Sequence, residues 1–272
     1  MKKLLLYYCL FFTISSNAQI YFCTDESVVS TGTLNLEECT FQFNQCGPIV
    51  DQKGDRVRFG DIALHPDGRL FGTIGSNNVY YIVEIDYKNC RLLDTLIRVP
   101  HIGATSLVIN KDGAFYTGFL RIYKYELEEN TIVLLGSAPT GGLTGDLIFY
   151  DNQLYGSAAY QISADSIFSS LYQIGLIDGS NGDENPKVMD LEDGLLIKGL
   201  TTQWESDCSK KKIIGDYSYS FLSERSEEYG LIEIELADST YQEICTGFNF
   251  GTVWDDSFFY LNNQRIYKTI HC

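Results

Sequence analysis

"FGDIALHPDGRLFGTIGSNNVYYIVEID" (Phe59–Asp86) contains three apolar runs separated by two polar turns. Asp67-Gly68 lies between the first two runs, and Asp-Gly between apolar runs is a strong hairpin signal because glycine accepts a positive φ. The third run, residues 79–86, alternates with a period of two residues, as a half-buried strand does. The stretch therefore predicts three consecutive antiparallel strands.

The same pattern recurs along the chain. The further copies are "ATSLVINKDGAFYTGF" at 104–119, "TGDLIFYDNQLYGSA" at 144–158, "KGLTTQWESDCSKKKIIGDY" at 198–217 and "FGTVWDDSFFYLNN" at 250–263. A third strand follows each copy, and a fourth follows most of them. A repeat of about 40 to 50 residues with four strands is typical of a β-propeller blade, which buries its two faces only against neighbouring blades.

We therefore expect an all-β fold with one β-propeller over residues 19–272. The alternative, a β-sandwich, has about seven strands and no such repeat. Six blades are expected, and five remain an alternative because the terminal fragments merge in more than one way. Residues 30–46 resemble third and fourth strands, whereas residues 250–272 supply inner strands. Pairing of the N- and C-terminal strands is expected to close the ring and remove an open sheet edge.

The first eighteen residues have the features of a secretory signal peptide. Lys2 and Lys3 precede the apolar run 4–14, and small or polar residues lead to a cleavage point after Ala18. The run is shorter than the about 20 residues that span a bilayer. The sequence predicts an exported protein, extracellular or periplasmic, without membrane insertion.

The formal net charge of −16 argues against nucleic acid as a partner. The acidity is explained most simply by solubility, and a cationic ligand or divalent ions are the alternative. We expect a monomer.

The repeat resembles the D-I-A-x-x-P-D-G-x-L-Y-G blades of secreted bacterial β-propeller repeat proteins, through Asp61-Ile62-Ala63, residues 66–72 and Ile85-Asp86. The resemblance implies display or binding more than catalysis. The chain is also distantly similar to lactonase-like propellers, which hold one divalent cation on the central axis with Glu, Asn and Asp side chains.

The candidate metal ligands are the residues at those strand starts that are expected to face the axis. Asp61 and Asp146 occupy matching repeat positions, and Ser106, Leu200 and Thr252 fill the others. Carboxylate and hydroxyl oxygens suit Ca²⁺. The alternative is that both aspartates satisfy backbone groups at the strand starts. No G-x-S-x-G segment is present, so no catalytic residue is expected, and we expect no cofactor apart from Ca²⁺ in the alternative interpretation.

Four aromatic residues near predicted loops are candidates for a carbohydrate or peptide surface: Tyr160, Tyr217, Tyr219 and Trp254. His65 precedes Pro66 in a predicted turn and is expected to be exposed. The leading hypothesis is a secreted, non-catalytic propeller that binds a protein or a glycan. The alternative is a metal-dependent hydrolase of the lactonase or esterase type.

Seven cysteines follow the predicted leader, and disulfides form outside the cytoplasm. Cys39 and Cys46 lie on one predicted strand, where ~3.3 Å per residue separates their Cα atoms by ~23 Å, beyond the ~7 Å limit for a bond. Cys39 and Cys90 hold matching positions in neighbouring units, whose outer strands should diverge. The expected pairs are therefore Cys208–Cys245 in one unit and Cys23–Cys272 between the chain ends.

Overall fold

The computed structural model describes residues 20–25, 27–35, 37–76, 79–100, 106–139, 141–163, 166–175, 185–204, 211–219, 228–246 and 265–269. All regular elements within these ranges are β-strands. The predicted signal peptide, residues 1–18, lies outside the described residues. Within these ranges no helix has the length and apolar character needed to cross a membrane.

The described strands form five four-stranded antiparallel sheets, here named blades A to E. Blade A contains β20 (Arg265–Thr269), β1 (Ile20–Asp25), β2 (Val28–Asn35) and β3 (Thr40–Pro48). Blade B contains β4 (Phe59–Leu64), β5 (Leu70–Ser76), β6 (Val79–Asp86) and β7 (Arg91–Val99). Blade C contains β8 (Ser106–Ile109), β9 (Phe115–Gly118), β10 (Arg121–Glu126) and β11 (Thr131–Ser137).

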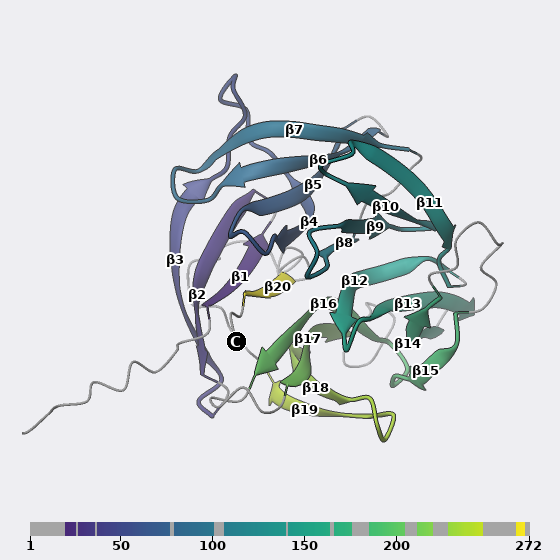
Figure 1. The fold of residues 1–272 in the computed structure, drawn as a ribbon. Helices are drawn as coiled ribbons and strands as arrows, with labels where there is room; N and C mark the ends of the chain where they lie inside the picture. Colours follow the sequence, from purple (N-terminus) through teal and green to yellow (C-terminus); the bar gives the residue numbers. More distant parts are fainter. Residues whose placement is uncertain are drawn as a thin grey trace, which may run out of the picture.

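Blade D contains β12 (Leu143–Tyr150), β13 (Gln153–Ser163), β14 (Ser166–Ile174) and β15 (Lys187–Asp190). Blade E contains β16 (Leu195–Trp204), β17 (Lys211–Tyr219), β18 (Tyr229–Glu235) and β19 (Thr240–Thr246). In each blade the strands are hydrogen-bonded in the order given. The blades are arranged around a central axis, with one strand of each blade innermost (Figure 1).

The innermost strands are β4, β8, β12, β16 and β20, and each contacts the next around the axis. The expectation of six blades is wrong for the described residues, which form five sheets. The reason is that the two terminal fragments contribute to one sheet. Strand β20 pairs antiparallel with β1, from Ile20 opposite Thr269 to Thr24 opposite Arg265.

The apolar core lies between the blades, because alternate residues of each strand face the two neighbouring sheets. Between blades B and C, the rings of Phe71 and Phe115 meet edge to face with centroids 4.9 Å apart, and both side chains are buried. Between blades D and E, residues such as Ile148 and Leu200 form a second buried cluster. No single blade could bury these residues alone.

Two disulfides connect neighbouring blades. Cys39 is bonded to Cys245 and Cys46 to Cys90, each with a Cα–Cα distance of 5.6 Å. The predicted Cys208–Cys245 pair is therefore wrong. The outer strand that carries Cys245 lies against the turn of the next blade, so its partner comes from that turn and not from its own blade. The predicted Cys23–Cys272 pair involves Cys272, which lies outside the described residues.

Candidate functional site

Asp61 lies at the start of the inner strand of blade B and is fully buried. Its Oδ1 accepts a hydrogen bond from the backbone amide of Ile62 at 2.7 Å. Its Oδ2 accepts a bond from the backbone amide of Leu107, in the inner strand of blade C, at 2.5 Å. The carboxylate therefore connects two neighbouring blades next to the axis.

Asp146 repeats this geometry one blade pair further along the ring. It is fully buried, and its Oδ1 accepts from the Leu147 amide at 2.7 Å. Its Oδ2 accepts from the Leu200 amide, in blade E, at 3.2 Å. Because the Leu200 amide donates this bond, Leu200 corresponds to Leu107. The position that matches Asp61 in blade E is thus Gly199, one residue before the Leu200 expected from the sequence.

Both aspartates consequently accept hydrogen bonds from backbone amides of the inner strands, which is the structural role considered from the sequence in place of metal binding. Ser106, the equivalent residue of blade C, donates its hydroxyl to the Gly118 carbonyl at 2.9 Å. Within the described residues, no three His, Cys, Asp or Glu side chains are placed to hold a metal ion together. Thr252, the fifth member of the predicted ring, lies outside those residues. These contacts give the aspartates a structural role between blades.

A cavity of about 150 Å³ lies among the inner strands of blades B to E. Pockets for small organic ligands commonly measure about 300 to 1,000 Å³, so this cavity is small for such a ligand. Its lining includes Leu64, Ile109 and Phe149, with Thr201 and Thr202 adding hydroxyl groups. The cavity fits water or a very small ligand better than a sugar.

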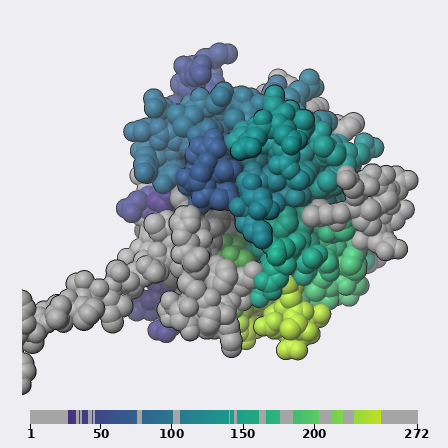
Figure 2. Space-filling model, viewed as in Figure 1, coloured from purple at the N-terminus to yellow at the C-terminus, as the bar shows by residue number. Residues whose placement is uncertain are grey.

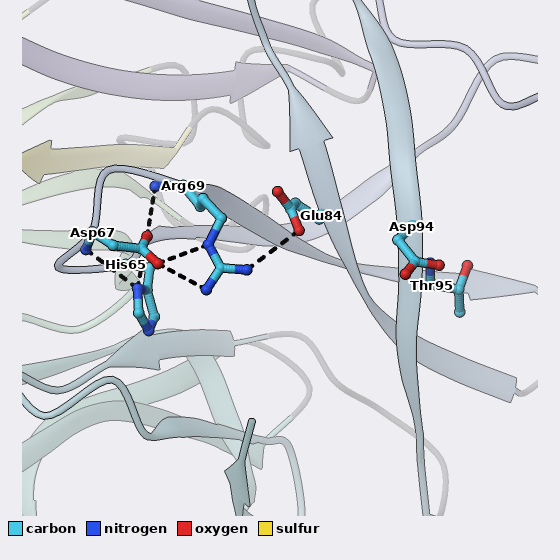
Figure 3. A network of polar contacts seen from close by, with 6 residues as sticks. All are labelled: His65, Asp67, Arg69, Glu84, Asp94 and Thr95. Atoms are coloured by element: carbon cyan, nitrogen blue, oxygen red, sulfur yellow. Dashed lines mark hydrogen bonds and ion pairs between the residues drawn. The ribbon is translucent and has the colours of Figure 1, made fainter. Parts of the chain in front are cut away.

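A polar network occupies the β4–β5 turn of blade B (Figure 3). The guanidinium of Arg69 lies 2.8 Å from Asp67 Oδ2 and 3.5 Å from Glu84 Oε2, so two carboxylates share one cation. Partial burial opposes ionisation of Asp67, but hydrogen bonds from the backbone and side chain of Arg69 prevail and lower its pKa. The network fixes the turn, and Arg69 offsets part of the negative charge of the two carboxylates.

His65 belongs to the same network and is not the exposed residue expected from the sequence. Its side chain is only 14% exposed, and Nδ1 lies 2.8 Å from Asp67 Oδ1. The imidazole packs against Phe71 and, across the blade boundary, against Phe115, with centroids 5.8 and 5.9 Å away. The proline that follows His65 shapes the turn, but the side chain points back onto the aromatic core.

Two of the aromatic surface candidates are buried. Tyr217 and Tyr219 are 3% and 2% exposed. Their hydroxyls donate to Glu243 and Glu192 respectively, each at 2.7 Å. This burial leaves almost no side-chain surface for a ligand, because their strand turns both rings into the space between blades D and E. Tyr160 is 36% exposed, and Trp254 lies outside the described residues.

The exposed apolar side chains concentrate instead on blade C. Leu120 is 56% exposed, and Val133 and Leu134 of the outer strand β11 are each 45% exposed. Blade C forms a continuous teal part of the molecular rim in the space-filling view (Figure 2). The sequence predicts a fourth strand after most copies of the repeat, and "TIVLLGS" (131–137) is one of them, but it does not predict an exposed surface there. The feature of the sequence that could have indicated this surface is the four-residue apolar run Ile132–Leu135, in a strand without charged residues.

The other outer strands carry features that discourage pairing with a foreign strand, such as charges, proline or a covalent bond. They are Arg91, Asp94 and Arg98 in β7, Lys187 and Asp190 in β15, Glu243 in β19, and Pro48 with the bonded Cys46 in β3. Strand β11 has none of these. Among the described strands, none pairs with the outer edge of β11. At its end the Ser137 carbonyl accepts from the Asn185 side chain, so the open edge covers residues 131–136.

Acidic side chains border this edge. Glu128 and Glu129, in the turn that precedes β11, are exposed, whereas Glu126 is paired with Lys124. The edge thus combines backbone groups that no described strand pairs with, apolar side chains and negative charge at one end.

No protein-family model matches the sequence, and a comparison with curated protein sequences also finds no match. Among solved structures, an α-L-arabinofuranosidase from Clostridium thermocellum is similar with a TM-score of 0.53 at 12% identity, over 85% of this chain and 92% of that one. This likeness supports the propeller fold alone.

Two further solved structures are more distant. A protein from Lactobacillus plantarum has a TM-score of 0.41 at 13% identity, over 84% of this chain and 67% of that one. The extracellular domain of a one-component system from B. thetaiotaomicron has a TM-score of 0.44 at 13% identity, over 84% of this chain and 28% of that one.

Proposed function

We propose that the protein is an exported, monomeric propeller without a cofactor, which binds a partner protein through the outer edge of blade C. The observation that carries this proposal is strand β11, an uncharged outer strand with Val133 and Leu134 each 45% exposed. An exposed strand edge offers a row of backbone donors and acceptors to an added strand. The two disulfides support export, since such bonds persist in oxidising compartments. In this proposal the β20–β1 pairing closes the ring.

The chemistry of the edge favours a protein over a glycan. An extended polypeptide pairs with backbone groups and places side chains on both faces of the sheet, where one face contacts Val133 and the other contacts Leu134. A glycan would instead use exposed aromatic rings and polar side chains, and two of the four aromatic candidates are buried. Glu128 and Glu129 complement lysine or arginine beside the paired segment. The partner is therefore an extended segment with apolar residues on both faces and a basic end.

Selection from a library of displayed random peptides tests the proposal. The mature protein should enrich peptides with adjacent apolar residues, one for each face of the strand, and a basic flank. Binding of the selected peptides should weaken by roughly tenfold or more in Leu134→Lys, because a charge then meets the apolar face of the added strand. Leu93→Lys is the matched control, since Leu93 is 42% exposed on the outer strand of blade B.

Two results would contradict the proposal. One is a lack of enrichment over an unrelated propeller used as bait. The other is enrichment of peptides that bind wild type and Leu134→Lys equally. A glycan array probed with the same mature protein separates the remaining possibility, since saccharide binding that survives Leu134→Lys would assign the function to another surface.

A further inference from the structure

The two disulfides are related by the blade repeat. Cys39 and Cys90 each end the turn before the outer strand of their blade, and both have a left-handed backbone, with φ of 50° and 55°. Their partners Cys245 and Cys46 each lie near the end of the outer strand in the preceding blade. The same type of bond therefore occurs at the E–A and the A–B boundaries, on both sides of blade A.

The A–B and E–A boundaries differ in the backbone contacts that accompany the disulfide. At the A–B boundary, the segment after β3 pairs with blade B: the Val50 amide donates to the Cys90 carbonyl at 3.2 Å, and the Leu92 amide donates to the Val50 carbonyl at 3.0 Å. At the E–A boundary, the chain itself returns to blade A through β20, which joins β1 by hydrogen bonds. The Cys39–Cys245 bond is the covalent link there, with 206 residues of separation along the chain.

We propose that the Cys39–Cys245 disulfide is a clasp, which closes blades A to E into a covalent circle and whose reduction opens the ring at the E–A boundary. The circle runs from Cys39 through β3 and blades B to E to Cys245, so it does not depend on β20. The Cys46–Cys90 bond is a second lock at a boundary that backbone pairing also holds.

Access to the sulfur atoms gives the two bonds an order of reduction. Cys46 is exposed, whereas Cys245 is 2% exposed. In thiol–disulfide exchange, a thiolate of an added dithiol attacks one sulfur and displaces the other cysteine as a thiolate. The second thiol of the reagent then attacks the mixed disulfide, so the protein gains two electrons and two protons while the reagent forms its own disulfide. The exposed Cys46–Cys90 bond should react first.

Stepwise reduction of the full mature chain with dithiothreitol tests the clasp, with alkylation and peptide mapping to identify the bonds and hydrogen exchange to follow the fold. Loss of Cys46–Cys90 alone should change exchange little, because Val50 still pairs with blade B. Loss of Cys39–Cys245 should accelerate exchange of residues 28–48 by about tenfold or more, while blades C and D keep their protection.

Variants make the test independent of the reagent. Cys46→Ser with Cys90→Ser should match the first stage, and Cys39→Ala with Cys245→Ala should match the second. Mapping that shows different pairs, unchanged exchange in the second variant, or equal acceleration in all five blades would each overturn the proposal. If the second variant does not accumulate, the reduced wild-type protein gives the same answer.

Discussion

Cys39 and Cys90 occupy the same turn position in neighbouring blades, and each is bonded to the outer strand of the blade before it. The next blade has Asn130 at this position, also with a positive φ, of 51°. In the preceding outer strand, Ile97 lies opposite Ile82 as Cys245 lies opposite Leu231. The B–C boundary thus repeats the turn conformation and the strand position of the link without the sulfur atoms.

Replacement of both residues, Asn130→Cys with Ile97→Cys, should form a third disulfide of the same type. A closed loop of this size stabilises by about 3 to 4 kcal/mol in the chain-entropy model, with smaller gains common in practice. Mass spectrometry of the non-reduced protein and thermal unfolding measure the bond and its effect. Free thiols at both positions in an oxidised sample would show that the blade repeat does not extend to this boundary.

Gly68 and Gly113 are a matched pair of turn glycines, with φ of 89° and 86°. A Cβ at Gly68 meets nothing within 4 Å, whereas a Cβ at Gly113 would lie 2.6 Å from His65 Nε2. Gly68→Ala should cost about 1 kcal/mol of unfolding free energy for the left-handed backbone. Gly113→Ala should cost roughly 1 to 2 kcal/mol more, because His65 must move off Phe115.

Chemical denaturation of both variants measures this difference. The double variant Gly113→Ala with His65→Ala is the control, since it removes the clash and should bring the cost of the Gly113 change close to that of Gly68→Ala. Equal costs for the two single variants would show that His65 does not contact the turn of blade C.

Asp61→Asn tests the structural role of the inter-blade carboxylate. The amide has one acceptor oxygen, so one of the two backbone amides, of Ile62 or Leu107, loses its buried partner. Such a loss costs roughly 1 to 3 kcal/mol. Asp94→Asn is the matched control, because exposed Asp94 accepts only from the neighbouring Thr95 amide among its recorded hydrogen bonds.

Calorimetric titration of the mature protein with Ca²⁺ separates this role from metal binding. We expect no binding tighter than millimolar in wild type, and therefore no calcium-dependent rise in melting temperature. Micromolar binding that Asp61→Asn or Asp146→Asn abolishes would reassign both carboxylates to a metal site.

The stability of the turn that carries Cys90 depends on pH through the carboxylate of Asp86. The side-chain amide of Asn89 donates to Asp86 and lowers its pKa from 3.8, against the effect of partial burial; the Asn89 backbone amide and Arg91 act in the same direction. A carboxylate whose pKa is lowered in the folded state stabilises the fold at pH values above its unfolded-state pKa. This stabilisation is lost as the pH falls through the folded-state pKa. The stability difference between wild type and Asp86→Asn should therefore persist at pH 6 and shrink below about pH 4. A difference that is constant from pH 6 to pH 2.5 would contradict this coupling.

The repeat in the sequence predicted the blade because turn chemistry and strand alternation are local. Asp67-Gly68 forms the predicted turn, residues 79–86 form the predicted strand, and the two aspartates occupy equivalent positions within inner strands. The number of blades was not predictable in the same way. It depends on whether β20 and β1 share a sheet, which is a contact between opposite ends of the chain.

The disulfide pairing and the exposure of side chains likewise depend on contacts between blades, which the local repeat does not determine. Cys245 bonds with Cys39 because of how blades E and A meet, and the repeat fixes equivalent positions but not the angle between blades. Tyr217 and Tyr219 lie near a predicted loop, yet the face of β17 on which they lie is turned into the D–E boundary. The edge of β11 was readable as uncharged and apolar, but its lack of a covering strand within the described residues is a tertiary property.

The central claim is that a partner segment adds a strand to β11 of blade C. Hydrogen exchange of the mature protein, with and without a peptide selected as described above, tests it most directly. We expect slower exchange at amides within residues 131–136 when the peptide is bound, with β7 and β19 unchanged. Protection confined to the inner strands β4, β8, β12 and β16, with none at β11, would contradict it and place the ligand on the axis.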